Sequence, residues 1–201
     1  MKRKKGILGG TFNPIHTGHL ILAEQAYHEF GLDEVLIMPS GVSYKKTGIV
    51  MPDKEMRLRM ARIAVSGIPY FTVSDLEIRR EGNTYTADTL IELNRTEPDT
   101  EFYFICGTDS LRDMENWKDP TDIFKGAVIL VALRAPETEG DIRDITEKYE
   151  KRFGARIHTL QTPYMDISSS MIREYLKTGR SVRFYLPEAL RVYLEEQGIY
   201  D

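Results

Sequence analysis

Length, composition and charge together describe an ordinary globular chain. Its 201 residues are 41% hydrophobic and 29% charged, which predicts one domain over residues 1–201 with a sizeable buried core. The formal net charge of −4 argues against a mainly electrostatic nucleic-acid binder. The single cysteine, Cys106, excludes an intramolecular disulfide, and no apolar run reaches the length of a membrane span. We therefore expect a cytoplasmic protein that binds neither nucleic acid nor membrane.

Apolar runs typical of strands alternate with helical patterns along the chain. Strands are predicted at residues 5–9, 34–39, 71–75, 101–107, 127–133 and 156–160. Helices are predicted at residues 18–30, 52–66 (with Pro52 in the first turn), 86–94, 142–153, 171–177 and 188–197. Because the central strands are almost continuously apolar, they should be covered on both faces. The alternation predicts an α/β fold, a doubly wound parallel sheet, with a helical C-terminal portion from about residue 168.

The first predicted strand leads into the segment GGTFNPIHTGH, residues 9–19. A glycine-rich turn between a strand and a helix lets the backbone approach a phosphate, and the first N–H groups of the helix then face the anion. His16 and His19 can donate hydrogen bonds to phosphate oxygens and add positive charge when protonated. The segment matches neither a Walker A loop nor a dinucleotide fingerprint. The alternative is that the glycines only form a turn and the histidines cap or pack.

A second polar cluster precedes the helix predicted at residues 171–177. Ser168, Ser169 and Ser170 stand before Arg173. Serine hydroxyls, free N–H groups at a helix start and a guanidinium would together bind a polyphosphate. The alternative is that one of the serines simply caps the helix.

These two motifs together resemble those of the H-x-G-H nucleotidyltransferase superfamily. Three further segments resemble bacterial nicotinate-nucleotide adenylyltransferases more narrowly. They are YTADTL at residues 85–90, CGTDSL at residues 106–111 with Trp117 following, and the end of the chain from Leu186 to Tyr200. The resemblance covers essentially the whole chain.

The resemblance implies a Rossmann-like fold that transfers AMP from ATP to the phosphate of nicotinate mononucleotide. The products are deamido-NAD, an intermediate of NAD biosynthesis, and pyrophosphate, and Mg²⁺ comes with ATP, with few or no protein ligands. The implied catalytic residues are His16, His19 and Arg173. The implied ATP-binding residues are Gly9, Gly10, Thr11, Phe12, His16, His19, Lys46, Gly107, Asp109, Arg134, Ile167, Ser168, Ser169 and Arg173. The residues implied to bind nicotinate mononucleotide are Tyr85, Thr86, Trp117 and Lys45.

The chain departs from the family at one loop, where the usual P-P-H-K is replaced by SYKK at residues 43–46. Positive charge is kept and two prolines are lost, so we expect a more flexible loop. Asp109 could instead cap a helix, Trp117 could pack in the core and Arg134 could be an ordinary loop charge.

Three other hypotheses for the function stay open. One is a nucleotidyltransferase with another acceptor, such as nicotinamide mononucleotide or pantetheine phosphate. Another is a cytidylyltransferase. The third is a nucleotide sensor without turnover. A homo-oligomer is also left open.

Overall fold

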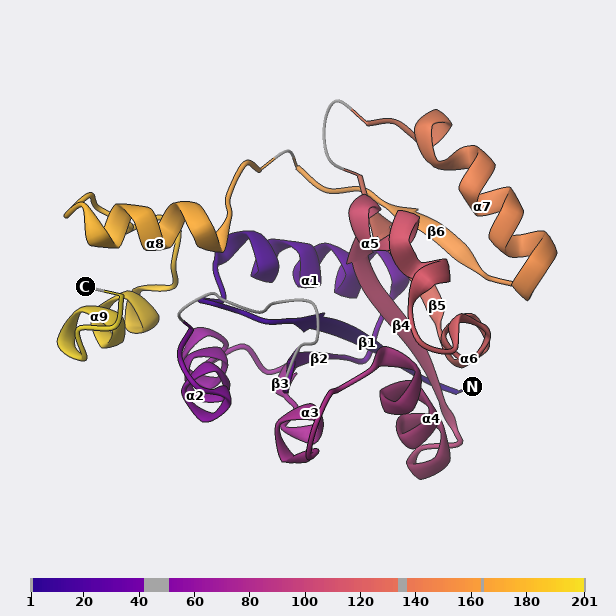
Figure 1. Cartoon of the computed structure of the whole chain (residues 1–201), viewed down its shortest axis with the longest axis horizontal. Helices are drawn as coiled ribbons and strands as arrows, with labels where there is room; N and C mark the ends of the chain where they lie inside the picture. Colours follow the sequence, from indigo (N-terminus) through magenta and orange to yellow (C-terminus); the bar gives the residue numbers. More distant parts are fainter. Residues whose placement is uncertain (1, 42–50, 134–136, 164, 201) are drawn as a thin grey trace.

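The computed structural model describes residues 2–41, 51–133, 137–163 and 165–200. Its centre is a sheet of six strands that all pair in parallel, in the order β3-β2-β1-β4-β5-β6 (Figure 1). The strands are β1 (Arg3–Gly10), β2 (Glu34–Pro39), β3 (Phe71–Val73), β4 (Thr100–Gly107), β5 (Val128–Ala132) and β6 (Ile157–Leu160). The predicted doubly wound α/β fold is confirmed.

The strand order reverses between β1 and β4, which lie side by side in the middle of the sheet. From β1 the chain builds outward to β3, and it then crosses back to β4 and builds the other half. In such a sheet, ligands bind beyond the carboxyl ends of the strands at the point of reversal. Gly10 ends β1 and Gly107 ends β4, so the predicted phosphate-binding turn lies at this point.

Two apolar cores lie on opposite faces of the sheet, because successive side chains of a strand point to opposite sides. Leu8 packs in one core and its neighbour Ile7 in the other. The first core is covered by α1 (Thr17–Phe30), α2 (Lys54–Ala64), α8 (Ser169–Lys177) and α9 (Glu188–Glu196). The second is covered by α4 (Thr86–Thr96), α5 (Thr108–Asp113), α6 (Pro120–Gly126) and α7 (Glu139–Phe153), with the short α3 (Leu76–Arg79) at its margin.

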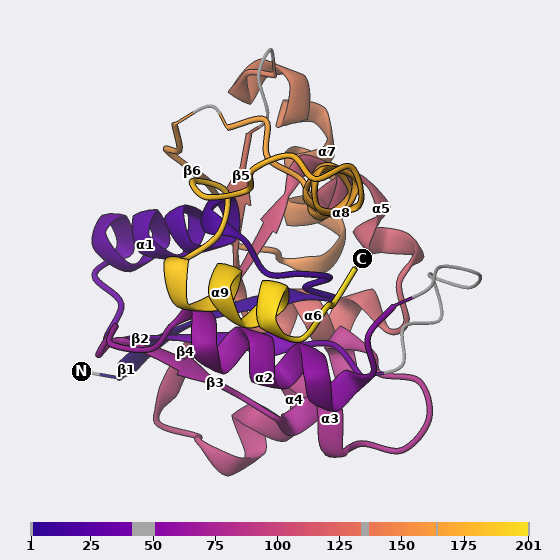
Figure 2. The same cartoon turned by 90° about the vertical axis from the view of Figure 1, so that its left-hand side faces the viewer.

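The C-terminal helices lie at the opposite end of the molecule from α6 and α7 (Figure 1). Helix α9 packs beside α2, and the chain then continues past α9 toward the C-terminus (Figure 2). No helix in the described part of the chain is both long enough and apolar enough to cross a membrane.

The prediction for Pro52 is wrong. Helix α2 begins at Lys54 and is capped by Asp53, whose carboxylate accepts a hydrogen bond of 2.7 Å from the Met56 N–H. Pro52 therefore precedes the cap and is not in the first turn. A good capping residue outweighs the preference of proline for the first helical position.

Candidate active site

The glycine turn after β1 is shaped by the side chain of Phe12. Phe12 has a φ of +49°, in the left-handed region, and its buried ring lies over Gly10. A Cβ at Gly10 would come within 2.8 Å of this ring, so only glycine fits there. The ring also meets His19 edge to face, with a centroid distance of 5.0 Å. The turn and the second histidine are thus packed as one unit.

The two histidines lie together at the start of α1. Their rings stack with centroids 3.7 Å apart. The backbone N–H of His16 donates to Nδ1 of the His19 ring over 3.2 Å. His16 is only 5% exposed, and this burial lowers its pKa to about 4. The His16 ring is therefore neutral near pH 7, and the positive charge that a protonated histidine would add is not supplied by His16 at this pH. Its Nδ1 atom is buried with no hydrogen-bond partner among the described residues.

The serine cluster lies at the start of α8 and contacts the glycine turn directly. Ser168 caps α8, since its Oγ accepts a hydrogen bond from the Met171 N–H; the capping alternative is confirmed for this residue. Ser169 Oγ donates to the Pro14 carbonyl over 2.9 Å. Arg173 Nη1 donates to the Asn13 carbonyl over 2.7 Å. The two motifs, more than 150 residues apart in the sequence, thus form one site.

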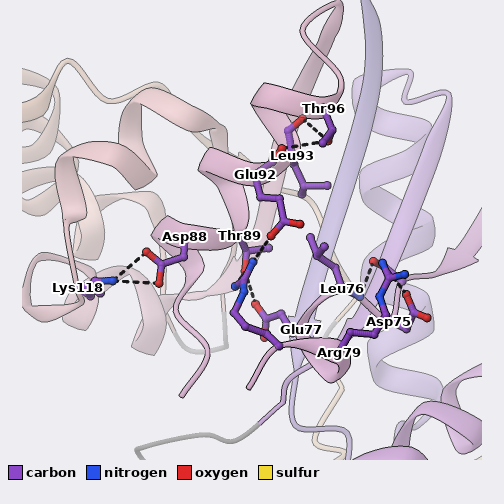
Figure 3. Close-up of polar contacts among 12 residues, drawn as sticks. Asp75, Leu76, Glu77, Arg79, Asp88, Thr89, Glu92, Leu93, Thr96 and Lys118 are labelled. Atoms are coloured by element: carbon purple, nitrogen blue, oxygen red, sulfur yellow. Dashed lines mark hydrogen bonds and ion pairs between the residues drawn. The ribbon is translucent and has the colours of Figure 1, made fainter. Parts of the chain in front are cut away.

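A second wall of the site is formed at the start of α4 and in the segment around Trp117. Lys118 Nζ contacts both carboxylate oxygens of Asp88, at 2.9 and 3.0 Å (Figure 3), and lies 4.9 Å from the centroid of the Tyr85 ring. Trp117 Nε1 donates to Asp113 over 3.0 Å. The indole is half-buried against the second core, so the core-packing alternative for Trp117 is partly correct.

A polar network lies beneath this wall (Figure 3). Thr89 Oγ1 donates to Glu77 over 2.8 Å and accepts from Arg80 over 2.9 Å. Arg80 also pairs with Glu92 on the next turn of α4. Burial raises the pKa of Glu77, while the nearby threonines and Arg80 counter part of this effect. The network ties α3 to α4 and fixes the position of the α4 start.

These elements enclose a cavity of about 890 Å³ at the carboxyl ends of the strands. Most of the predicted site residues line it. They are Gly9, Gly10, Thr11, Phe12, His16, His19, Tyr85, Thr86, Gly107, Trp117, Ile167, Ser168, Ser169 and Arg173.

Four predicted residues are not placed in the cavity wall. Asp109 lies in the first turn of α5 outside the lining, and Gly107 is the N-cap of that helix, so the capping alternative for Asp109 is wrong. Lys45, Lys46 and Arg134 lie outside the described residues, as does the rest of the departing SYKK loop.

The cavity wall also contains polar residues that the sequence analysis did not assign to the site. They include Asn13, Ser40, Glu77, Thr84, Thr89, Lys118 and Asp166. Ser40 directly follows β2, so its place at a strand end was a usable signal. Its Oγ is buried without a hydrogen-bond partner among the described residues. Glu77 belongs to the four-residue α3, which is too short to leave a periodic pattern.

A parallel sheet with a glycine turn and paired histidines at its point of strand reversal is typical of nucleotidyltransferases. The cytidylyltransferase-like family matches residues 7–175.

Two relatives named "Probable nicotinate-nucleotide adenylyltransferase" are similar over their full length. That of Lachnoclostridium phytofermentans is 45% identical over 98% of this chain and 99% of its own. That of Dehalococcoides mccartyi is 42% identical over 98% and 97%. The chain therefore belongs to the nicotinate-nucleotide adenylyltransferase family.

A solved structure shares the fold. It is the Plasmodium falciparum nicotinic acid mononucleotide adenylyltransferase complexed with NaAD, which has a TM-score of 0.82 and 19% identity over 99% of this chain and 98% of its own.

Proposed function

We propose that this protein transfers the AMP part of ATP to the phosphate of nicotinate mononucleotide, forming deamido-NAD and pyrophosphate. An acceptor phosphate oxygen attacks the α-phosphorus of ATP. The bond from that phosphorus to the oxygen bridging to the β-phosphorus breaks, and pyrophosphate leaves with the negative charge. The acceptor itself is the nucleophile, so catalysis consists of positioning and charge stabilisation.

One observation supports this proposal most strongly: the bond between Arg173 and the Asn13 carbonyl, which closes the glycine turn and the α8 start around one space. A guanidinium has five N–H donors, and Nη1 and Nη2 each donate one hydrogen bond to a group in the described part of the chain. The remaining N–H groups can bind phosphate oxygens. Ser169 contributes its backbone N–H at the helix start, because its hydroxyl hydrogen is taken by Pro14.

His16 and His19 act in this proposal as hydrogen-bond donors to the phosphates. Since burial keeps the pKa of His16 near 4, this ring donates as a neutral imidazole. A donor placed where negative charge develops stabilises the transition state more than the ground state. The stacking of the two rings keeps both beside the glycine turn.

We propose that Mg²⁺ enters this site as a companion of ATP, with few or no protein ligands. The described residues contain no group of three or more His, Cys, Asp or Glu side chains able to hold a metal, and the donors around the glycine turn are hydroxyls, N–H groups and a guanidinium. Bound to the phosphate oxygens, Mg²⁺ would neutralise part of their charge.

The acceptor ring is proposed to lie on Trp117, whose indole can support a pyridinium by a cation–π contact. Thr86 at the start of α4 would donate to the nicotinate carboxylate. An amide in its place would point its own N–H₂ group at these donors and leave one unpaired. An unpaired buried donor costs about 1–3 kcal/mol, so we expect a preference for the acid on the order of tenfold.

The test is pyrophosphate release from ATP with a panel of acceptors. We expect the highest kcat/KM with nicotinate mononucleotide, a lower one with nicotinamide mononucleotide and none with pantetheine phosphate. Equal efficiencies for the acid and the amide would indicate a dual-specificity enzyme. ATP binding without release for any acceptor would indicate a nucleotide sensor.

A further inference from the structure

The glycine turn keeps a backbone conformation that its own sequence does not favour. Phe12 is in the left-handed region, where a bulky side chain is rare. Such conformations persist when the surrounding structure over-determines them, and they cluster at ligand-binding sites. Residues outside the turn that keep it in this conformation can therefore affect ligand binding.

Three donors from distant parts of the chain hold the oxygen atoms of this turn. Arg57 Nη1, on α2, donates to the Thr11 carbonyl over 2.8 Å. Arg173 on α8 holds the Asn13 carbonyl, as described above. The Tyr200 hydroxyl, beyond α9, donates to Oδ1 of Asn13 over 2.6 Å. Asn13 itself is buried, so each of these bonds fixes a group with little freedom to move.

When a carbonyl oxygen is held on one side of a peptide unit, the N–H group of the same peptide unit points to the opposite side. The Thr11 carbonyl and the Phe12 N–H belong to one planar trans peptide unit and point in opposite directions. Arg57 therefore turns the Phe12 N–H away from α2. Thr11 and Phe12 both line the cavity, where an N–H group can meet a phosphate oxygen.

Arg57 also places a positive charge behind the turn. Its side chain is among the most deeply buried in the protein, and none of the carboxylates in the described ranges lies within ion-pair distance of it. Besides Thr11, it donates only to the Gly41 carbonyl among described groups, over 3.0 Å. Burial lowers the pKa of Arg57, and the charge of Asp53 at the N-cap of α2 counters part of this effect. Because Arg57 forms no ion pair with a described carboxylate, this buried cation favours an anion nearby.

We propose that Tyr200 is a positioning residue of the active site. Through Asn13, and together with Arg57, its hydroxyl holds the glycine turn in the conformation that binds the polyphosphate of ATP. The inference rests on the proposed function, because it takes ATP as the ligand. Burial raises the pKa of Tyr200, so the hydroxyl keeps its proton and donates at neutral pH.

The test is Tyr200→Phe, which removes only the hydroxyl. Because Asn13 Oδ1 then loses its donor, we expect ATP affinity to fall about tenfold. Calorimetry with a non-hydrolysable ATP analogue measures this without an acceptor. We expect kcat/KM for ATP to fall in parallel, and the KM for nicotinate mononucleotide to stay within about twofold.

Tyr193→Phe is the matched control. The Tyr193 hydroxyl, on α9, contacts Met56 Sδ on α2 at 3.1 Å and does not touch the turn. We expect this variant to bind the analogue within about twofold of wild type, with both melting temperatures recorded. In an Asn13→Ala background, Tyr200→Phe should add no further loss, because residues that act through one another are not additive.

Three results would overturn the inference: unchanged analogue affinity in Tyr200→Phe, an equal loss in Tyr193→Phe, or full additivity with Asn13→Ala. If the wild-type chain did not bind the analogue, the proposed function itself would fail. Wild-type binding with an unaffected Tyr200→Phe would refute only the role of Tyr200.

Discussion

Burial of His16 should make the folded protein less stable as the pH falls below neutral. The pKa of this ring is lowered from an ordinary value of 6.5 to about 4 in the folded chain. Between these values the unfolded chain binds a proton at His16 that the folded chain does not. The contribution of the neutral His16 ring to the free energy of unfolding is therefore complete above pH 6.5, and it is lost as the pH falls toward 4. The full difference in pKa between the two states corresponds to about 3 kcal/mol of stability. About 2 kcal/mol of this is lost between pH 7 and pH 5.

The assay is urea denaturation at pH 7 and pH 5, for wild type and for His16→Asn. His16 is the N-cap residue of α1. Asparagine is also a good N-cap and does not titrate, so this variant should lose about 2 kcal/mol less than wild type between the two pH values. His158→Asn is the control, because this exposed ring is solvated in both states. Equal losses in wild type and His16→Asn would refute the argument that His16 is buried as a neutral ring.

Three other substitutions probe the phosphate and acceptor sites. His19→Ala should lower kcat by about 10²–10³ with little change in ATP affinity; near-normal turnover in a steady-state assay would support a capping role. Arg173→Lys should lower kcat/KM for ATP despite keeping the charge, because an ammonium cannot reproduce the fork of a guanidinium; unchanged kinetics would make Arg173 dispensable. Trp117→Ala should raise the KM of both mononucleotides and leave that of ATP unchanged, and an unaffected acceptor KM would contradict the stacking role.

The strands and the long helices could be predicted because their patterns are strong. The apolar runs that became β2 and β5 are continuous, and the predicted helix at residues 18–30 differs from α1 by one residue. Helices α3, α5 and α6 were not predicted, because four to seven residues are too few for a hydrophobic period to show. Their positions depend on packing against the second core.

The glycine turn and the α8 start could be proposed as one site from the sequence because both carry local motifs, and the structure brings the two segments into contact. Their phosphate-binding role stays a prediction. The neutral state of His16 could not be predicted from the sequence, because it follows from burial by residues that are distant in sequence. Arg57 and Tyr200 also left no local signal. They reach the turn from 46 and 187 residues away, and only the packing of α2 and α9 brings them there.

The most direct test of adenylyl transfer is to identify the product. Purified protein is incubated with ATP, Mg²⁺ and nicotinate mononucleotide, and the mixture is analysed by chromatography with mass detection alongside measured pyrophosphate. Because one P–O bond forms for each one broken, deamido-NAD and pyrophosphate should appear in equal amounts. Both should nearly disappear with His19→Ala. Release of AMP without a dinucleotide, or no turnover with this acceptor, would contradict the proposed function.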